Sequence, residues 1–152
     1  MPIFRSHRLR TGRFSEQSRL YLITLVVRQR EPVFNDWSSA RPLIVSMKAC
    51  QAEGGADSLC WVIMPDHFHW LMELKGRDLA GEVARLKSRS TVLFNRANQR
   101  VGSLWQKGFH DRALRREEDV KSVARYIVAN PLRAGLAERI GDYPLWDAVW
   151  LQ

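Results

Sequence analysis

The chain has 152 residues, of which 45% are hydrophobic and 26% charged, enough apolar material for one folded domain and too much for an intrinsically disordered chain. Its formal net charge of +8 and pI of about 10.2 indicate an anionic partner. No apolar run approaches the roughly 20 residues that cross a bilayer, and Cys50 and Cys60 lack a paired motif, so we expect a cytoplasmic protein without disulfides.

Basic residues concentrate in two parts of the chain. Seven of the 24 lysines and arginines fall in the first 30 positions, and nine lie between Arg85 and Arg116, where Asp111 is the only acid. Residues 1–18 also show no hydrophobic period. We therefore predict a basic N-terminal arm over 1–18, one folded domain over 19–152, and binding to a polyanion.

The first half of the domain predicts a strand, a helix and a hairpin. Residues 20–27 form a continuous β-prone run, short enough for a buried strand. Apolar residues at helical intervals predict a helix over 37–51, after an Asn-Asp pair that can cap it. Two β-prone runs, 59–64 and 67–74, meet at a Pro-Asp turn and predict an antiparallel hairpin.

The second half predicts two helices separated by an extended or loop segment. Asp78 can cap a helix over 79–97, and a closing helix over 117–130 is expected to end at Pro131. The whole order predicts an α+β, ferredoxin-like (split βαβ) fold, with an antiparallel sheet and helices on one face. A C-terminal helical extension would carry Tyr126.

The hairpin contains a pair of histidines that could bind a metal. Because side chains alternate along a strand, His67 and His69 share one face of strand 67–74, while Phe68 and Trp70 share the other. Two imidazoles placed in this way commonly hold one divalent cation. A partly exposed pair on the polar face of a sheet would give the same pattern, so the residues alone leave both interpretations open.

A histidine pair needs further ligands, and the sequence does not single one out. A zinc hydrolase of the metallo-lactamase type would have an aspartate two residues after the second histidine, where this chain has Leu71. His7 and His110 could complete a site through the fold, although neither has a diagnostic spacing.

The closing helix offers a candidate nucleophile. Tyr126 and Asn130 lie one turn apart beside the apolar stripe of this helix. A lone tyrosine in this position is usually a residue at the edge of the core. A phenol is a poor nucleophile at neutral pH and benefits from a metal that polarises its target, so the tyrosine and the histidine pair are more informative together than apart.

Four segments together resemble the REP-associated tyrosine transposases, which belong to the HUH single-tyrosine transposases. They are residues 64–71 (MPDHFHWL), 104–106 (LWQ), 110–112 (HDR) and 126–136 (YIVANPLRAGL). The resemblance extends from about residue 10 to the end of the chain, and the two longer motifs in this order are specific.

The resemblance implies a nucleoid-associated nuclease and strand transferase that acts on single-stranded DNA beside a REP-like hairpin. Carried over by position, His67 and His69 would be metal ligands, and Tyr126 would attack the scissile phosphate to leave a 5′-phosphotyrosine and a free 3′-hydroxyl. Asn130 matches the third ligand, where related insertion-sequence enzymes usually have glutamine. The metal would be Mg²⁺ or Mn²⁺.

Basic side chains of the arm and of the second helix are the candidates for phosphate contacts, with one tryptophan that could stack on a base or pack in the core. They are Arg8, Arg10, Arg13, Lys87, Arg89, Arg96, Arg100 and Trp105. Two alternatives remain: a domesticated hairpin-binding protein without turnover, and a metal-dependent phosphohydrolase without a covalent step. A monomer is favoured over a homodimer.

Overall fold

A computed structural model of the chain describes residues 19–76, 78–115 and 119–149. The elements in chain order are β1 (Arg19–Val26), η1 (Arg28–Arg30), α2 (Trp37–Ala52), β2 (Ala56–Met64), β3 (His67–Leu74), α3 (Leu79–Asn98), β4 (His110–Ala113), α4 (Val120–Val128), α5 (Asn130–Arg133), η2 (Ile140–Asp142) and β5 (Trp146–Ala148). None of the helices in these ranges combines the length and apolar character needed to cross a membrane.

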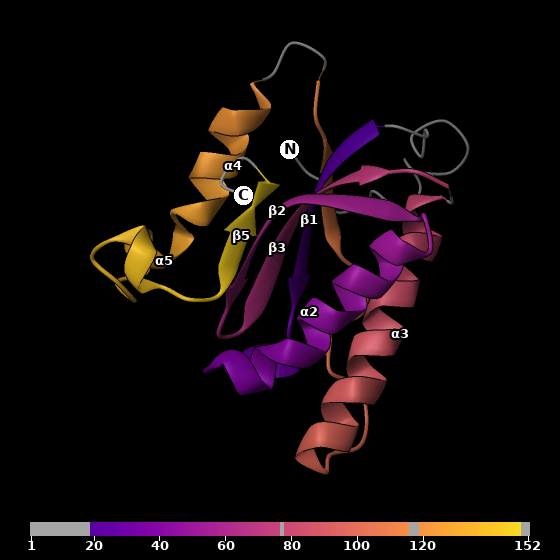
Figure 1. Cartoon of the computed structure of the whole chain (residues 1–152). Helices are drawn as coiled ribbons and strands as arrows, with labels where there is room; N and C mark the ends of the chain where they lie inside the picture. Colours follow the sequence, from indigo (N-terminus) through magenta and orange to yellow (C-terminus); the bar gives the residue numbers. More distant parts are fainter. Residues whose placement is uncertain (1–18, 77, 116–118, 150–152) are drawn as a thin grey trace.

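The strands form one five-stranded sheet in the order β4-β1-β3-β2-β5, with every neighbouring pair antiparallel (Figure 1). The antiparallel α+β architecture predicted from the sequence is confirmed. From β1 to β4 the elements follow the β-α-β-β-α-β order of the split βαβ motif, with β1 and β3 in the centre. The histidine pair therefore lies on a central strand, where neighbours on both sides fix its position.

Each long helix begins at an aspartate whose carboxylate satisfies backbone N–H groups of the first turn. Asp36 accepts from the Ser39 N–H at 2.9 Å, and the Ser39 hydroxyl accepts in return from the Asp36 N–H. Asp78 caps α3 and Asp119 caps α4 through their carboxylates, which accept from first-turn N–H groups. These caps explain why α2, α3 and α4 begin where they do.

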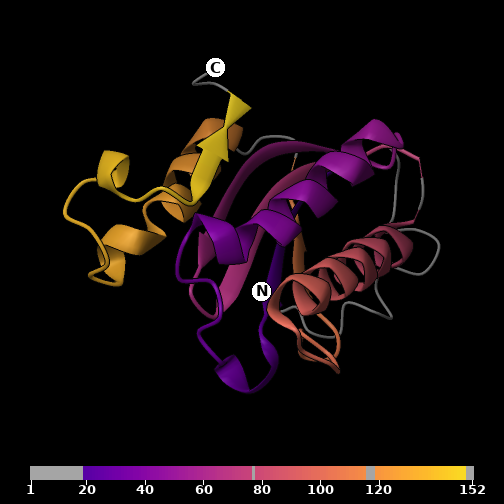
Figure 2. The ribbon, with the colours of Figure 1, turned by 60° about the horizontal axis from the view of Figure 1, so that its bottom comes forward.

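The sheet separates two apolar clusters. Phe68 and Trp70 point into the larger cluster, between the sheet and helices α2 and α3. Leu71 points to the opposite face, where it packs with Ala124 and Ile127 of α4. Figure 2 shows α2 and α3 on one side of the sheet and α4 on the other. The tyrosine helix thus covers the face that α2 and α3 leave open.

The C-terminal part differs from the prediction in two respects. Pro131 does not end the helical path, because the chain bends at Ala129 and continues as α5, with the proline in its first turn, where no N–H is needed. Strand β5, which the sequence analysis did not predict, pairs with β2 and forms one edge of the sheet. Residues 116–118, within or before the predicted closing helix, lie outside the described ranges.

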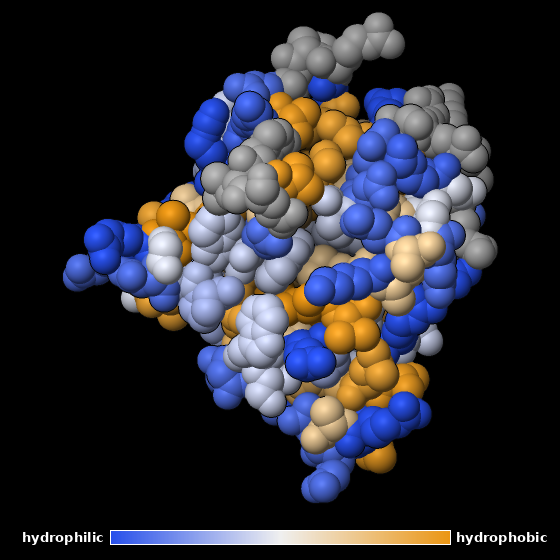
Figure 3. Space-filling model, viewed as in Figure 1, coloured by the Kyte–Doolittle hydropathy of each residue, from blue (hydrophilic) through white to orange (hydrophobic). Residues whose placement is uncertain are grey.

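The surface of the α2 side is mixed in character. Figure 3 shows apolar patches interrupted by hydrophilic side chains. A hollow of about 550 Å³ lies between α2 and the β2–β5 edge and is lined by residues that include Trp37, Trp61 and Val149. It does not include the histidine pair.

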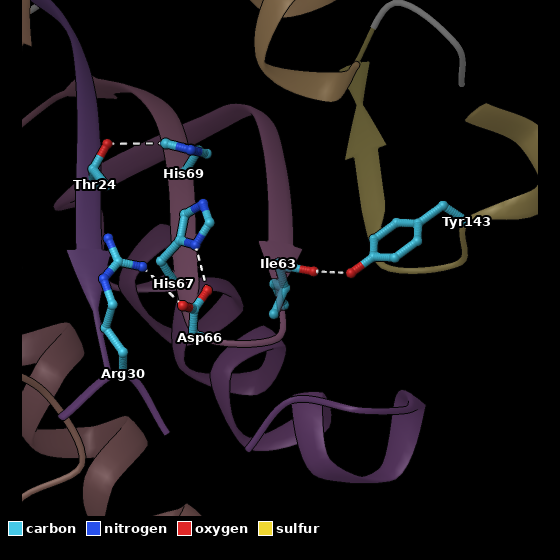
Figure 4. Close-up of polar contacts among 7 residues, drawn as sticks. All are labelled: Thr24, Arg30, Ile63, Asp66, His67, His69 and Tyr143. Atoms are coloured by element: carbon cyan, nitrogen blue, oxygen red, sulfur yellow. Dashed lines mark hydrogen bonds and ion pairs between the residues drawn. The ribbon is translucent and has the colours of Figure 1, made fainter. Parts of the chain in front are cut away.

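A hydrogen bond from Tyr143 joins the segment before β5 to the sheet, and removal of this bond is expected to destabilise the fold. Its hydroxyl donates to the backbone carbonyl of Ile63 at 2.7 Å (Figure 4). Tyr143→Phe keeps the ring and removes this bond, so we expect the free energy of unfolding to fall by about 0.5–1.5 kcal/mol. Urea unfolding followed by circular dichroism measures the change, and an unaltered midpoint would show that the bond contributes nothing.

Candidate active site

The two histidines of β3 face one another on the α4 side of the sheet, as the strand alternation predicted. Their ring centroids are 4.9 Å apart and the ring planes are inclined by 82°. Cross-strand pairing places Met64 beside His67 and Val62 beside His69, and both of these neighbours belong to the cluster that α4 covers. The imidazoles therefore share their face with the tyrosine helix.

Each imidazole is oriented through its Nδ1 atom (Figure 4). His67 Nδ1 lies 2.7 Å from Asp66 Oδ1, and the other carboxylate oxygen accepts from Arg30 Nη1 at 2.8 Å. His69 Nδ1 lies 2.9 Å from the Thr24 hydroxyl. Donation from Nδ1 in both rings would leave each Nε2 with a lone pair, which is the arrangement usual for histidines that bind metals.

Burial keeps the His69 imidazole neutral, and hydrogen bonds keep the Asp66 carboxylate ionised. Burial lowers the pKa of His69 to about 3, helped by the nearby His67 ring and by the Arg133 guanidinium. Partial burial acts to raise the pKa of Asp66, but hydrogen bonds from His67 and Arg30 outweigh it and leave that pKa below its ordinary value. A neutral imidazole beside an ionised carboxylate suits the binding of a cation.

His69 is expected to resist protonation in mild acid. Its ring should stay neutral at pH 5 in the folded, metal-free protein, whereas in the unfolded chain it takes a proton near pH 6.5. Because the unfolded state then binds more protons, this residue lowers folding stability progressively as pH falls from about 6.5 to about 3. Long-range ¹H–¹⁵N NMR of the imidazoles, assigned with His69→Gln, checks the prediction, and a midpoint near 6.5 would contradict it.

Tyr126 lies on α4 with its side chain directed outward. The residue is 65% exposed, while Ala124 and Ile127 of the same helix are buried against the sheet. An exposed phenol can meet a substrate without displacing core residues. A tyrosine that served only to complete the core would be more deeply buried.

Arg133, which the sequence analysis did not single out, lies against Tyr126. Its guanidinium carbon lies 4.0 Å from the centre of the Tyr126 ring, and its Nη2 donates to the Tyr126 carbonyl at 2.8 Å. Its charge also acts on His69. Its place in the family motif of residues 126–136, close after Tyr126, is the signal that could have drawn attention to it.

The donor set fits a hard divalent cation if an amide completes it. Among the described residues, no cluster of three or more His, Cys, Asp or Glu side chains could hold a metal. Asn130, the predicted third ligand, follows α4 and donates through Nδ2 to the Ile127 carbonyl at 3.1 Å, an orientation that leaves its Oδ1 to act as a ligand.

Of the two other histidines considered as ligands, one lies near the pair and one lies outside the described residues. His110 lies on β4 opposite Thr24, which in turn pairs with His69, so the two histidines stand one strand apart on the same face. His7 lies outside the described residues.

The structure gives several of the predicted DNA-contacting residues roles within the fold. Lys87 Nζ donates to the Gln106 and Gly108 carbonyls at 2.8 Å each, and Trp105, 5% exposed, packs in the core and donates to the Ser90 hydroxyl. Of the two roles considered for Trp105, core packing is therefore the one observed.

The arginines of this set differ among themselves. Arg89 and Arg100 form ion pairs with Glu53 and Glu31, whereas Arg96 is exposed near the end of α3. Ion-paired arginines can still bind phosphate if the pair opens. The predicted contacts at Arg8, Arg10 and Arg13 lie outside the described residues.

Comparisons with known proteins agree with the motifs. Residues 16–130 match the model of the family described as "Transposase IS200 like". A Haemophilus influenzae protein named as a REP-associated tyrosine transposase is 28% identical over 141 residues, covering 82% of this chain and 77% of its own. The REP-associated tyrosine transposase of Escherichia coli is 27% identical over 86 residues, covering 55% of this chain and 49% of its own.

Solved structures show the same fold. A REP-associated tyrosine transposase bound to a REP hairpin superposes with a TM-score of 0.73 at 21% identity, covering 88% of this chain and 79% of that one. A protein of Deinococcus radiodurans named as a transposase gives a TM-score of 0.55 at 20% identity, covering 77% and 94%. The family match covers most of the chain, and the resemblance to REP-associated tyrosine transposases is confirmed: the chain belongs to the family of IS200-like transposases.

Proposed function

We propose that the protein cleaves and rejoins single-stranded DNA beside a REP-like hairpin, through a 5′-phosphotyrosine on Tyr126. His67, His69 and Asn130 would hold one divalent cation, Mg²⁺ or Mn²⁺. The observation that carries the proposal is the imidazole pair, oriented through Nδ1 and lying on the sheet face that the tyrosine helix covers.

In the cleavage step, the Tyr126 oxygen attacks the scissile phosphorus. The new bond joins the phenol oxygen to the phosphate, and the bond from phosphorus to the 3′-oxygen breaks. The phenol proton passes to solvent, and the leaving 3′-oxygen takes up a proton to become a hydroxyl. A bound divalent cation would polarise the phosphate and neutralise charge that develops on its oxygens.

The phosphotyrosine retains the energy of the broken phosphodiester, so a 3′-hydroxyl can reverse the reaction and join strands without a nucleotide cofactor. Asp66 and Thr24 would serve this step indirectly by fixing the His67 and His69 rings.

The hairpin substrate is proposed from the family and from charge. The structural neighbour that is named as bound to a REP hairpin shares this fold, and the net charge of +8 favours a polyanion. The cationic residues proposed to contact phosphates are those named from the sequence, including the exposed Arg96. We further propose that one copy of the chain suffices for cleavage, because β5 already occupies the β2 edge of the sheet.

The test is an adduct assay with the full chain. The protein is incubated with 5′- and 3′-labelled hairpin oligonucleotides that carry single-stranded flanks, in Mn²⁺ and in Mg²⁺, and the products are separated on a denaturing gel. We expect a protein band that carries the DNA segment on the 3′ side of the cut. Tight hairpin binding without an adduct at any flank sequence would instead indicate a hairpin-binding protein without turnover.

A further inference from the structure

Arg133 places a guanidinium against the candidate nucleophile. Its guanidinium carbon lies over the face of the Tyr126 ring, 4.0 Å from the ring centre. The residue is exposed, so a substrate could reach it.

A purely structural role accounts for only part of this arrangement. The bond from Nη2 to the Tyr126 carbonyl closes the end of α4, where backbone carbonyls lack helical partners. A guanidinium has five N–H donors in a planar fork that matches two oxygens of a phosphate. The bond to the carbonyl engages one nitrogen of the fork and leaves the group beside the phenol.

The backbone bond has a mechanical consequence. Because Arg133 is tied to the Tyr126 carbonyl, any movement of the tyrosine helix relative to the sheet carries the cation with the nucleophile. A positive charge that travels with the phenol would be present at the phosphate each time the phenol reaches it.

We propose that Arg133 is a catalytic residue that binds the non-bridging oxygens of the phosphate attacked by Tyr126. This inference rests on the proposed function. In the ground state the guanidinium pairs with the phosphodiester anion. As the Tyr126 oxygen bonds to phosphorus, negative charge on the non-bridging oxygens increases, and the fork stabilises it more strongly than it stabilises the substrate.

The experiment measures single-turnover adduct formation and hairpin affinity for Arg133→Ala and Arg133→Lys. The matched control is Arg125→Ala, which removes the same charge from the last turn of α4, next to the tyrosine. We expect Arg133→Ala to slow adduct formation by about 100- to 1,000-fold with hairpin affinity within about threefold of wild type. The lysine variant should recover only part of the rate, because it has charge without the fork.

A second measurement separates phosphate binding from helix capping. With a single-diastereomer phosphorothioate at the scissile position, wild type should show a rate difference between the two isomers that Arg133→Ala reduces, whereas loss of a cap would slow both isomers equally. Three results would overturn this inference and leave the proposed function standing. They are equal slowing of the two isomers by Arg133→Ala, an Arg133→Ala rate within threefold of wild type, and an Arg133→Ala rate equal to that of Arg125→Ala. Absence of any adduct in wild type overturns the proposed function and this inference together.

Discussion

Tyr126→Phe is expected to reduce the covalent DNA adduct to background, while the hairpin is bound as tightly as by wild type. Phenylalanine keeps the ring under the Arg133 guanidinium and removes only the attacking oxygen, so no bond to phosphorus can form. Because the side chain is 65% exposed, the fold should be undisturbed. Denaturing gels report the adduct, and fluorescence anisotropy reports binding.

Tyr143→Phe is a matched control, since it also removes one phenolic hydroxyl, but from a residue that bonds to the Ile63 carbonyl. It should leave the adduct yield unchanged at a temperature where the protein is folded. An undiminished adduct in Tyr126→Phe would remove Tyr126 from the mechanism. Nicking that persists without an adduct would support the metal-dependent phosphohydrolase.

His69→Ala is expected to lower cleavage by more than about 100-fold and to weaken Mn²⁺ binding. Disturbing groups that merely orient metal ligands typically costs 10- to 100-fold, so removal of a ligand should cost at least the upper figure. Excess EDTA should abolish cleavage by wild type, and added Mn²⁺ should restore it. Calorimetric titration with Mn²⁺ measures the affinity.

His110→Ala tests whether His110 or Asn130 is the third metal ligand, because His110 lies on the same sheet face, on the strand next to that of Thr24. If it weakens Mn²⁺ binding as much as His69→Ala does, and Asn130→Ala does not, then His110 is the third ligand. Cleavage by His69→Ala at the wild-type rate would mean that the imidazole pair is no part of the metal site.

The parts of the fold that follow from local rules could be predicted from the sequence. The faces of β3 follow from strict alternation, and Asp36 and Asp78 mark helix starts because their carboxylates satisfy nearby N–H groups. The prediction that the histidine strand and the tyrosine helix act together came from the family motifs. Periodicity gave the apolar stripe of α4 but could not say which sheet face it would cover.

The parts that depend on distant segments could not be predicted. The ion pair between Arg30 and Asp66 joins residues 36 positions apart. Gln29 and Arg30 adopt positive φ, which nothing in their residue types suggests. Lys87 resembled a DNA contact because charge alone does not show that two carbonyls of a later loop surround its ammonium. Short β5 carries too little pattern to distinguish it from a loop.

The β5 segment also bears on how shortened forms of the protein would behave. Without it, β2 would lose its strand pairing over residues 60–62, and with it the bond between the Ile63 N–H and the Leu145 carbonyl. An apolar edge of this length is a template on which a second molecule can add a strand, the first step toward aggregation. Strand β5 therefore shields the β2 edge from pairing with another molecule during handling and storage.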